Sequence, residues 1–218
     1  TKFMRVTDEN SPYYGKLLLN EAGLPQSTGV SEKIGDQQAD CMLGWNNSFR
    51  YKNFALSFQI DGRLGGDIYS YTNYALQIAG RAECTAPGGM REDFVVDGVI
   101  RQQDGSYAPS TIKVSQQDYW QAIGTGNTGI GEANIYDATN IRLRNIALNY
   151  SFPSSMLKKT IFQQLKLGFS INNVWMIYSD MNGIDPEAVF ITNTNATGFE
   201  NCASPTSRSY LFNVTLGF

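Results

Sequence analysis

The residues that could carry out chemistry are few, because the chain contains no histidine. Its absence removes the Ser-His-Asp and Cys-His arrangements of nucleophilic catalysis, His-ligated zinc and the commonest general base. Three cysteines, Cys41, Cys84 and Cys202, lie far apart and form no CxxC motif. This spacing favours inert thiols or one loop disulfide over a metal site. We therefore expect no catalytic residue and no cofactor.

The acidic residues Asp180, Asp185 and Glu187 form the densest carboxylate group near the C-terminus. Their spacing is not that of a known calcium-binding loop, so we assign no metal. A hydrolase without histidine would need a pair of carboxylic acids. Asp185 and Glu187 are too close in sequence for spacing alone to assign them that role, so we do not expect an enzyme.

Two groups of residues remain as candidate ligand contacts. Asp61, Arg63 and Asp67 share one face of an extended segment, where salt bridges within the sheet are the competing role. Aromatic side chains lie in a long irregular segment, where they suit sugar rings or peptide side chains but can also pack within the loop. These aromatic candidates are Tyr107, Tyr119 and Trp120.

The elements that would position these residues are long strands. Successive strand residues point to opposite faces of a sheet. Residues 208–218 alternate between an aromatic or aliphatic side chain and a mostly small, polar one, and 9–11 residues is roughly the length with which a tilted strand crosses a bilayer. The same alternation predicts strands at 43–51, 54–68, 140–152 and 165–176, with a bulge at Asn172 and Asn173.

The predicted connections alternate between short links (52–53 and 153–164) and long ones (71–139 and 177–207). Outer-membrane barrels show this asymmetry, with short periplasmic turns and long extracellular loops. A short helix is expected at 115–123, where Ser115 and Asp118 resemble a capping box. Arg142 and Arg144 share the parity of Ile146 and Leu148, which places them near or above the outer lipid headgroups.

Composition leaves two architectures open. The 218 residues are 42% hydrophobic, with a mean hydropathy of −0.29, which suits either a soluble β-sandwich or a transmembrane barrel. No apolar run reaches the ~18 residues of a membrane helix. A net charge of −3 and the lack of a basic run argue against nucleic acid as a partner.

Several segments, in the same order, resemble the C-terminal end of the SusC/RagA family of TonB-dependent outer-membrane transporters. They are 34–36 with 44–54, 56–58 and 65–70; 136–146 with 150–153; Asn172-Asn173 followed by Asp185-Pro186-Glu187; and 205–210 with the terminal Phe218. The resemblance covers residues 34 to 218.

The resemblance implies an all-β fold: an antiparallel transmembrane barrel of 22 strands with a plug, of which this chain supplies about the last five strands. It implies import of oligosaccharides or peptides, driven by the TonB complex through the absent plug. A SusD-like surface lipoprotein, lipid or lipopolysaccharide, and the remainder of the barrel and plug are the implied partners. The implied location is the outer membrane of a Gram-negative cell.

The expected organisation is therefore an extracellular loop region at 1–40 and barrel strands at 41–218. Without a signal peptide at its N-terminus, the chain is expected to be the C-terminal part of a longer exported product. Five strands leave two open edges, which lipid does not tolerate. A siderophore or vitamin receptor and a soluble carbohydrate-binding β-sandwich domain remain as alternatives.

Overall fold

The computed structural model describes the whole chain except residues 125, 127–128, 182 and 190–193. Strands dominate and helices are few and short, so the predicted all-β class is confirmed. The strands are β1 (Leu18–Leu19), β2 (Cys41–Tyr51), β3 (Phe54–Leu64), β4 (Asp67–Ser70), β5 (Phe94–Val95), β6 (Val99–Arg101), β7 (Tyr107–Pro109), β8 (Lys113–Val114), β9 (Ile135–Asp137), β10 (Asn140–Ser151), β11 (Gln164–Ser179), β12 (Phe199–Glu200) and β13 (Ser209–Gly217). The helices are α1 (Tyr71–Ile78), α2 (Gln116–Ile123), α3 (Ser154–Leu157) and the 3₁₀ turns η1 (Glu83–Thr85), η2 (Pro87–Gly89) and η3 (Gly131–Asn134).

The chain divides into two compact units, each built from three separate stretches of sequence. The first unit consists of residues 1–36, 68–136 and 189–202, and the second of residues 37–67, 137–188 and 203–218. The segments that were predicted as the two long connections thus supply most of the first unit. The long strands make up the second unit.

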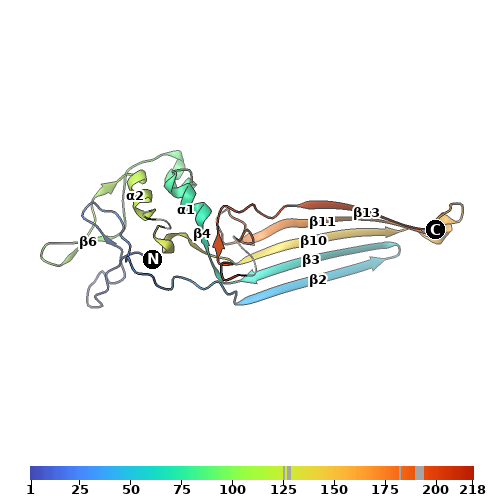
Figure 1. The fold of residues 1–218 in the computed structure, drawn as a ribbon, viewed down its shortest axis with the longest axis horizontal. Helices are drawn as coiled ribbons and strands as arrows, with labels where there is room; N and C mark the ends of the chain where they lie inside the picture. Colours follow the sequence, from blue (N-terminus) through green and yellow to red (C-terminus); the bar gives the residue numbers. More distant parts are fainter. Residues whose placement is uncertain (125, 127–128, 182, 190–193) are drawn as a thin grey trace. The chain divides into compact units, whose positions relative to one another are not determined.

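The second unit is one antiparallel sheet with the strand order β13-β11-β10-β3-β2 (Figure 1). Its five long strands lie where the alternating pattern predicts them. The two-residue link Lys52-Asn53 joins β2 to β3, with Lys52 in the left-handed region at φ 51°. A helical turn, α3, follows Pro153 in the second short link.

Each strand of this sheet contributes to one apolar row and one polar row. In the apolar row, Ile146 lies between Phe58 and Ile171, and Phe169 is opposite Phe212. In the polar row, a Cβ atom on Gly168 would lie 2.4 Å from Oδ1 of Asn149, so a larger residue there would require the Asn149 side chain to move.

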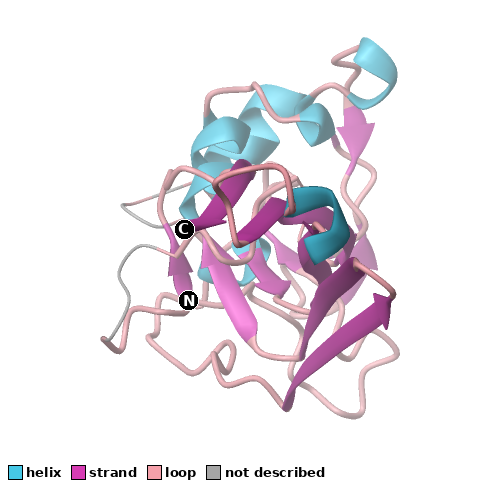
Figure 2. Cartoon of the chain, turned by 90° about the vertical axis from the view of Figure 1, so that its right-hand side faces the viewer, coloured by secondary structure: helices cyan, strands magenta, loops and turns pink. Residues whose placement is uncertain are grey.

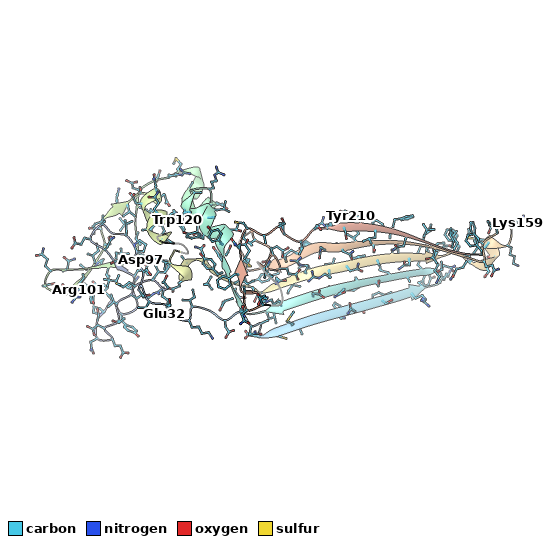
Figure 3. The ribbon with its side chains drawn as sticks, in the orientation of Figure 1. Glu32, Asp97, Arg101, Trp120, Lys159 and Tyr210 are labelled. Atoms are coloured by element: carbon cyan, nitrogen blue, oxygen red, sulfur yellow. The ribbon has the colours of Figure 1, made fainter. Side chains whose placement is uncertain are left out.

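The apolar row is exposed rather than packed under a second layer. Phe212 is 68% exposed and Trp45 is 59% exposed, and Tyr210 projects from β13 in Figure 3. A β-sandwich buries such a row in the ~10 Å between its sheets. The exposed row therefore contradicts the sandwich alternative.

One predicted strand is shorter than expected. The pattern placed Ile68 in line with Phe58 and Ile60, but β3 ends at Leu64. Gly65 and Gly66 follow with φ of 71° and 85°, values that side chains with a Cβ rarely adopt. The strand ends there, so Asp67 and Ile68 belong to β4 and not to the face of β3.

The first unit has a conventional small core. Leu19, Val96 and Val114 are buried together, and Tyr119 of α2 packs against them. The helix α2 lies where it was predicted, and the Ser115 hydroxyl accepts a hydrogen bond from the Asp118 amide as its N-cap. Helix α1 was not predicted; both helices are drawn in cyan in Figure 2.

A buried carboxylate fastens the start of α1. Glu200 of β12 is 2% exposed, and β12 pairs in parallel with β4, which leads directly into α1. Glu200 accepts hydrogen bonds from the Ser70 hydroxyl and from the Thr72 amide and hydroxyl. A negative charge at a helix N-terminus is stabilised by the helix dipole.

Two further features concern the cysteine thiols and the lengths of the helices. Cys41, Cys84 and Cys202 are exposed free thiols. Within the described residues, no helix has the length and apolar character needed to cross a bilayer.

Candidate functional site

The densest group of charged side chains lies on the polar row of the second unit, at the N-terminal end of β10. The pairing of β10 with β3 and with β11 skips Arg144, so that Leu143 and Asn145 are both in register and Arg144 is an extra residue. Such a bulge reverses the parity of everything before it. Arg142 therefore lies opposite Asp61 on the polar row, and Leu143 lies opposite Ile60 on the apolar row.

This bulge corrects the placement of both arginines. Simple alternation assigned Arg142 and Arg144 to the row of Ile146 and Leu148, near the lipid headgroups. Instead, the side chains of both arginines make ion pairs with carboxylates on the polar side of the sheet. Arg142 is only 3% exposed, so it is not solvated as expected.

Arg142 binds two connecting segments at once. Its Nη2 donates to Oδ1 of Asp185, and its Nη1 donates to the Thr206 hydroxyl over 2.6 Å. Asp185 also accepts hydrogen bonds from the hydroxyl and the amide of Thr206, the latter over 2.9 Å. Burial raises the pKa of Asp185, but the bonds from Thr206 and Arg142 outweigh it and lower this pKa to about 2.

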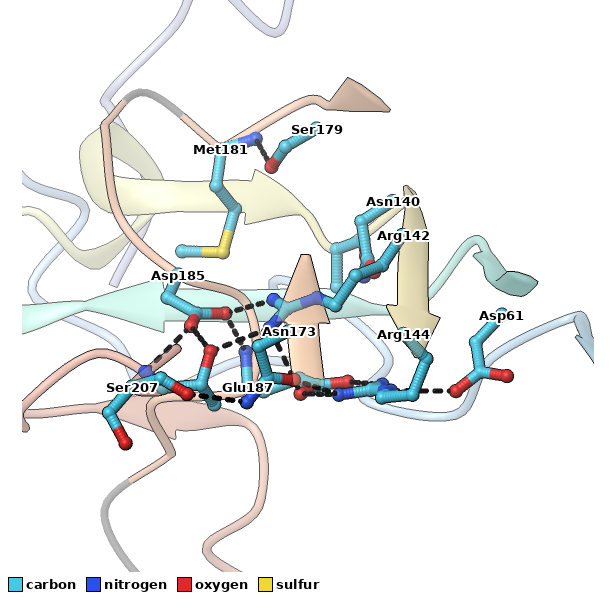
Figure 4. A network of polar contacts seen from close by, with 12 residues as sticks. Asp61, Asn140, Arg142, Arg144, Asn173, Ser179, Met181, Asp185, Glu187 and Ser207 are labelled. Carbon is cyan, nitrogen blue, oxygen red and sulfur yellow. Dashed lines mark hydrogen bonds and ion pairs between the residues drawn. The ribbon is translucent and has the colours of Figure 1, made fainter. Parts of the chain in front are cut away.

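Arg144 extends the same network across the sheet (Figure 4). Its Nε donates to Oδ2 of Asp61 over 2.8 Å, and its guanidinium also pairs with Glu187. Asn173, in the left-handed region at φ 51°, accepts a bond from Arg144 Nη1 and donates to the Ser207 carbonyl over 2.8 Å. The predicted irregularity at Asn172 and Asn173 is thus confirmed, because the register shift of β10 lies opposite it.

The network is a clamp of paired charges. Residues of β3, β10 and β11 hold the segments around Asp185 and Thr206 against the polar face of the sheet, beside a cavity of about 410 Å³ that Arg142 and Arg208 help to line. Both Asp185 and Glu187 pair with arginine, which leaves neither of them suited to act as a general acid or base. The described residues hold no group of three potential metal ligands, and no metal was assigned to Asp180, Asp185 and Glu187.

The three charged candidates do not gather at one point. Asp61 belongs to the clamp, where it also accepts a bond from Gln59 over 2.8 Å. Arg63 donates to the backbone carbonyls of Gln37 and Gly65, at 2.8 and 3.4 Å. Asp67 is the first residue of β4, after the two glycines that separate β4 from β3. Ligand contact by these three residues stays a prediction.

The three aromatic candidates also separate. Tyr107 lies in β7 opposite Arg101. Tyr119 packs its ring 5.2 Å from that of Phe94, and burial raises the pKa of its hydroxyl. Trp120, labelled in Figure 3, lines a small hollow of the first unit. Substrate contact by these residues stays a prediction as well.

Comparison with known proteins identifies relatives over most of the chain. The chain is 27% identical over 197 residues to TonB-dependent receptor P3 of Formosa agariphila and 29% identical over 187 residues to TonB-dependent receptor P39 of the same organism. These matches cover 88% and 85% of the chain but only 18% and 17% of the relatives, so the chain spans less than a fifth of their length. No family model matches.

The fold is similar to solved structures. The RagAB peptide importer in its "open-open" state superposes with a TM-score of 0.54 at 15% identity, over 81% of this chain and 17% of that one. Its "closed-closed" state gives 0.55 at 14% identity, over 87% and 18%.

The sequence relatives are receptors rather than enzymes by name, and the fold likeness extends over 87% of this chain. The chain is similar in sequence to TonB-dependent receptors and similar in fold to part of the RagAB peptide importer.

Proposed function

We propose that this chain is part of the wall of an outer-membrane importer for oligosaccharides or peptides. The observation that carries the proposal is the exposed apolar row of the five-stranded sheet, with a polar row on the other face. A soluble protein rarely leaves so large an apolar surface open. In a transmembrane barrel, the same row contacts acyl chains and the polar row lines the interior.

Aromatic side chains at both ends of the apolar row support this placement. Tyr178 and Tyr150 mark the two ends, and Tyr178 lies opposite Ile141 of β10. From Ile141 to Tyr150 the strand rises by roughly 27 Å, or about 20 Å along the membrane normal at a tilt near 40°. An apolar band of about 25 Å between two aromatic girdles is typical of outer-membrane barrels. One end carries Trp45, Trp175 and Tyr178, and the other carries Tyr51, Phe54 and Tyr150.

The two edge strands, β2 and β13, support a larger closed wall. Each pairs on one side only within the described sheet. Unpaired backbone groups in hydrocarbon cost several kcal/mol each, so the edges require further strands. We propose that the rest of a 22-stranded barrel and its plug supply these strands. TonB would act through the plug, and a SusD-like lipoprotein would assist at the outer mouth.

The polar clamp has a role in this proposal. With the polar row facing the interior, Arg142 and Arg144 fasten the segments around Asp185 and Thr206 to the inner wall at the extracellular end. Fixed segments at that position would shape the entrance for substrate.

The test is localisation followed by uptake with the full-length receptor. We expect the receptor in the outer-membrane fraction, together with a surface lipoprotein, and we expect its deletion to abolish uptake of fluorescent oligosaccharides or oligopeptides. Recovery of the receptor in a soluble fraction would refute the proposal. Loss of ferric-chelate or vitamin uptake, with polymer uptake intact, would instead support the siderophore or vitamin receptor.

A further inference from the structure

A hollow of about 220 Å³ in the first unit has the lining of a ligand site. It lies between the C-terminal end of α1 and one face of α2. Amide side chains and one indole dominate its lining, namely Gln77, Gln116, Gln117, Gln121 and Trp120. An engineered cavity of about 150 Å³ accepts benzene, so this hollow has room for one substituted six-membered ring.

The sequence of α2 explains this lining. Residues 116, 117, 120 and 121 fall on one face of a helix with 3.6 residues per turn. Tyr119 and Ile123 lie beside Gln116 on the adjoining part of the helix surface, where Tyr119 packs against the core of the unit and Ile123 is 3% exposed. The core therefore holds one side of α2 and leaves the amide-and-indole side to the hollow.

The indole of Trp120 is held in place. Its Nε1 donates to Oε1 of Gln116 over 3.2 Å, and the Tyr119 ring meets it edge-on at 5.1 Å. Gln116 is itself buried. A fixed indole offers a flat apolar surface with little loss of conformational entropy on binding.

The opposite wall determines which ligand charge the hollow can accommodate. Gln77 is buried, and its Oε1 accepts a bond from Asn134 Nδ2 over 3.0 Å. Arg91, the one charged residue of the lining, donates to the Gly80 carbonyl at the end of α1 over 2.7 Å. The lining contains no carboxylate, so a cationic ligand would find no partner there.

We propose that this hollow binds one neutral sugar ring of an oligosaccharide, which rests on the proposed import function and narrows its substrate class. A carboxamide both donates and accepts hydrogen bonds, and so does a sugar hydroxyl. The apolar C–H face of a pyranose stacks on the Trp120 indole. A peptide bound by strand addition needs main-chain bonds to a strand edge, which this helical hollow does not provide.

The experiment measures binding of neutral oligosaccharides and of neutral oligopeptides to the full-length receptor in detergent. Trp120→Ala should weaken binding of a neutral oligosaccharide about tenfold, with Trp120→Phe intermediate because it keeps a ring. Gln117→Ala, at an exposed position that leaves the helix intact, should weaken the same glycan a few-fold. Tyr14→Ala, which removes an exposed aromatic outside the hollow, is the matched control and should change nothing.

Unchanged glycan binding in both Trp120→Ala and Gln117→Ala would overturn the inference, and so would a loss confined to peptides. A receptor that imports peptides but binds no neutral oligosaccharide would also overturn it, while leaving the proposed import function intact. A receptor that imports neither polymer would instead remove the function on which the inference rests.

Discussion

At the scale of single residues, the clamp depends on one buried charge pair. Arg142 and Asp185 have side chains that are 3% and 9% exposed, and Thr206 bridges them through its hydroxyl. The Nε of Arg142 is buried without a hydrogen-bond partner. Removing one member of such a pair leaves an uncompensated buried charge, whereas replacing both members costs much less.

We therefore expect a strong coupling between these two positions. Arg142→Met or Asp185→Leu alone should destabilise the clamp by about 3–5 kcal/mol, and the double variant should cost less than the sum. The backbone amides of Glu187 and Thr206 donate hydrogen bonds to Asp185, so hydrogen exchange at these amides reports the opening of the clamp. Arg101→Ala, at an exposed position of the first unit, is the control. Additive effects of the two single variants would contradict the coupling.

The pKa of Asp185 gives the clamp a dependence on pH. Its folded value of about 2 lies below the ordinary value of 3.8. A lowered folded pKa contributes stability that is fully present above pH 4 and is lost as the pH falls toward 2. The loss amounts to about 2 kcal/mol. Pepsin should cut the segment around Asp185 increasingly between pH 4 and pH 2, and Asp185→Asn should remove this dependence.

At the scale of elements, the bulge at Arg144 decides which face the clamp occupies. If Arg144 were paired in the ladder instead of bulging out, Arg142 would turn to the apolar row of Ile146 and Leu148. An arginine on the lipid face costs about 2–4 kcal/mol at the bilayer midplane and less near the interface. The bulge thus keeps two arginines on the polar side of the sheet.

Deletion of Arg144 should therefore leave the register of β10 intact. It removes the bulge and the ion pairs with Asp61 and Glu187, whereas Arg144→Ala keeps the bulge and removes only the ion pairs. Deletion of Ala147, which is paired in the regular ladder, would instead turn Ile146 away from the apolar row. Heat-dependent gel mobility of the full-length receptor measures assembly. We expect folded receptor for both changes at Arg144 and little for the Ala147 deletion. Equal amounts of folded receptor in all three variants would show that the parity of β10 does not control assembly.

The strands were predictable because their signal is local. Alternation with period two is a property of neighbouring residues, so it identified all five long strands. The capping residues Ser115 and Asp118 are an equally local signal, and they identified the helix at 116–123. The placement of Arg142 was not predictable by parity, because an extra residue is visible only in the pairing of β10 with β3 and β11. In the sequence, the sign of this extra residue was that two arginines fell in an otherwise apolar row.

Other features depend on contacts between distant parts of the sequence. Helix α1 contains tyrosine, threonine and asparagine, which have modest helix propensity, and Glu200 stabilises its start from 128 residues away. The clamp likewise joins Asp61 to Glu187 through Arg144. No local pattern reveals such pairs, and the resemblance to a family indicated only that the Asp185-Pro186-Glu187 segment matters.

At the scale of the whole molecule, the proposed function requires one face of the sheet to meet lipid and the other to meet water. The chain covers less than a fifth of its receptor relatives, and both edge strands of its sheet have an open side. The sheet therefore has to be examined within the full-length receptor.

The most direct measurement is spin-label accessibility along β13 in receptor reconstituted in lipid bilayers. Labels replace Phe212 and Val214 of the apolar row, and Leu211 and Asn213 of the polar row, after Cys41, Cys84 and Cys202 have been changed to serine. The account expects Phe212 and Val214 to be accessible to oxygen dissolved in lipid, and Asn213 to a water-soluble nickel reagent. Equal inaccessibility of both rows, or the opposite pattern, would contradict it.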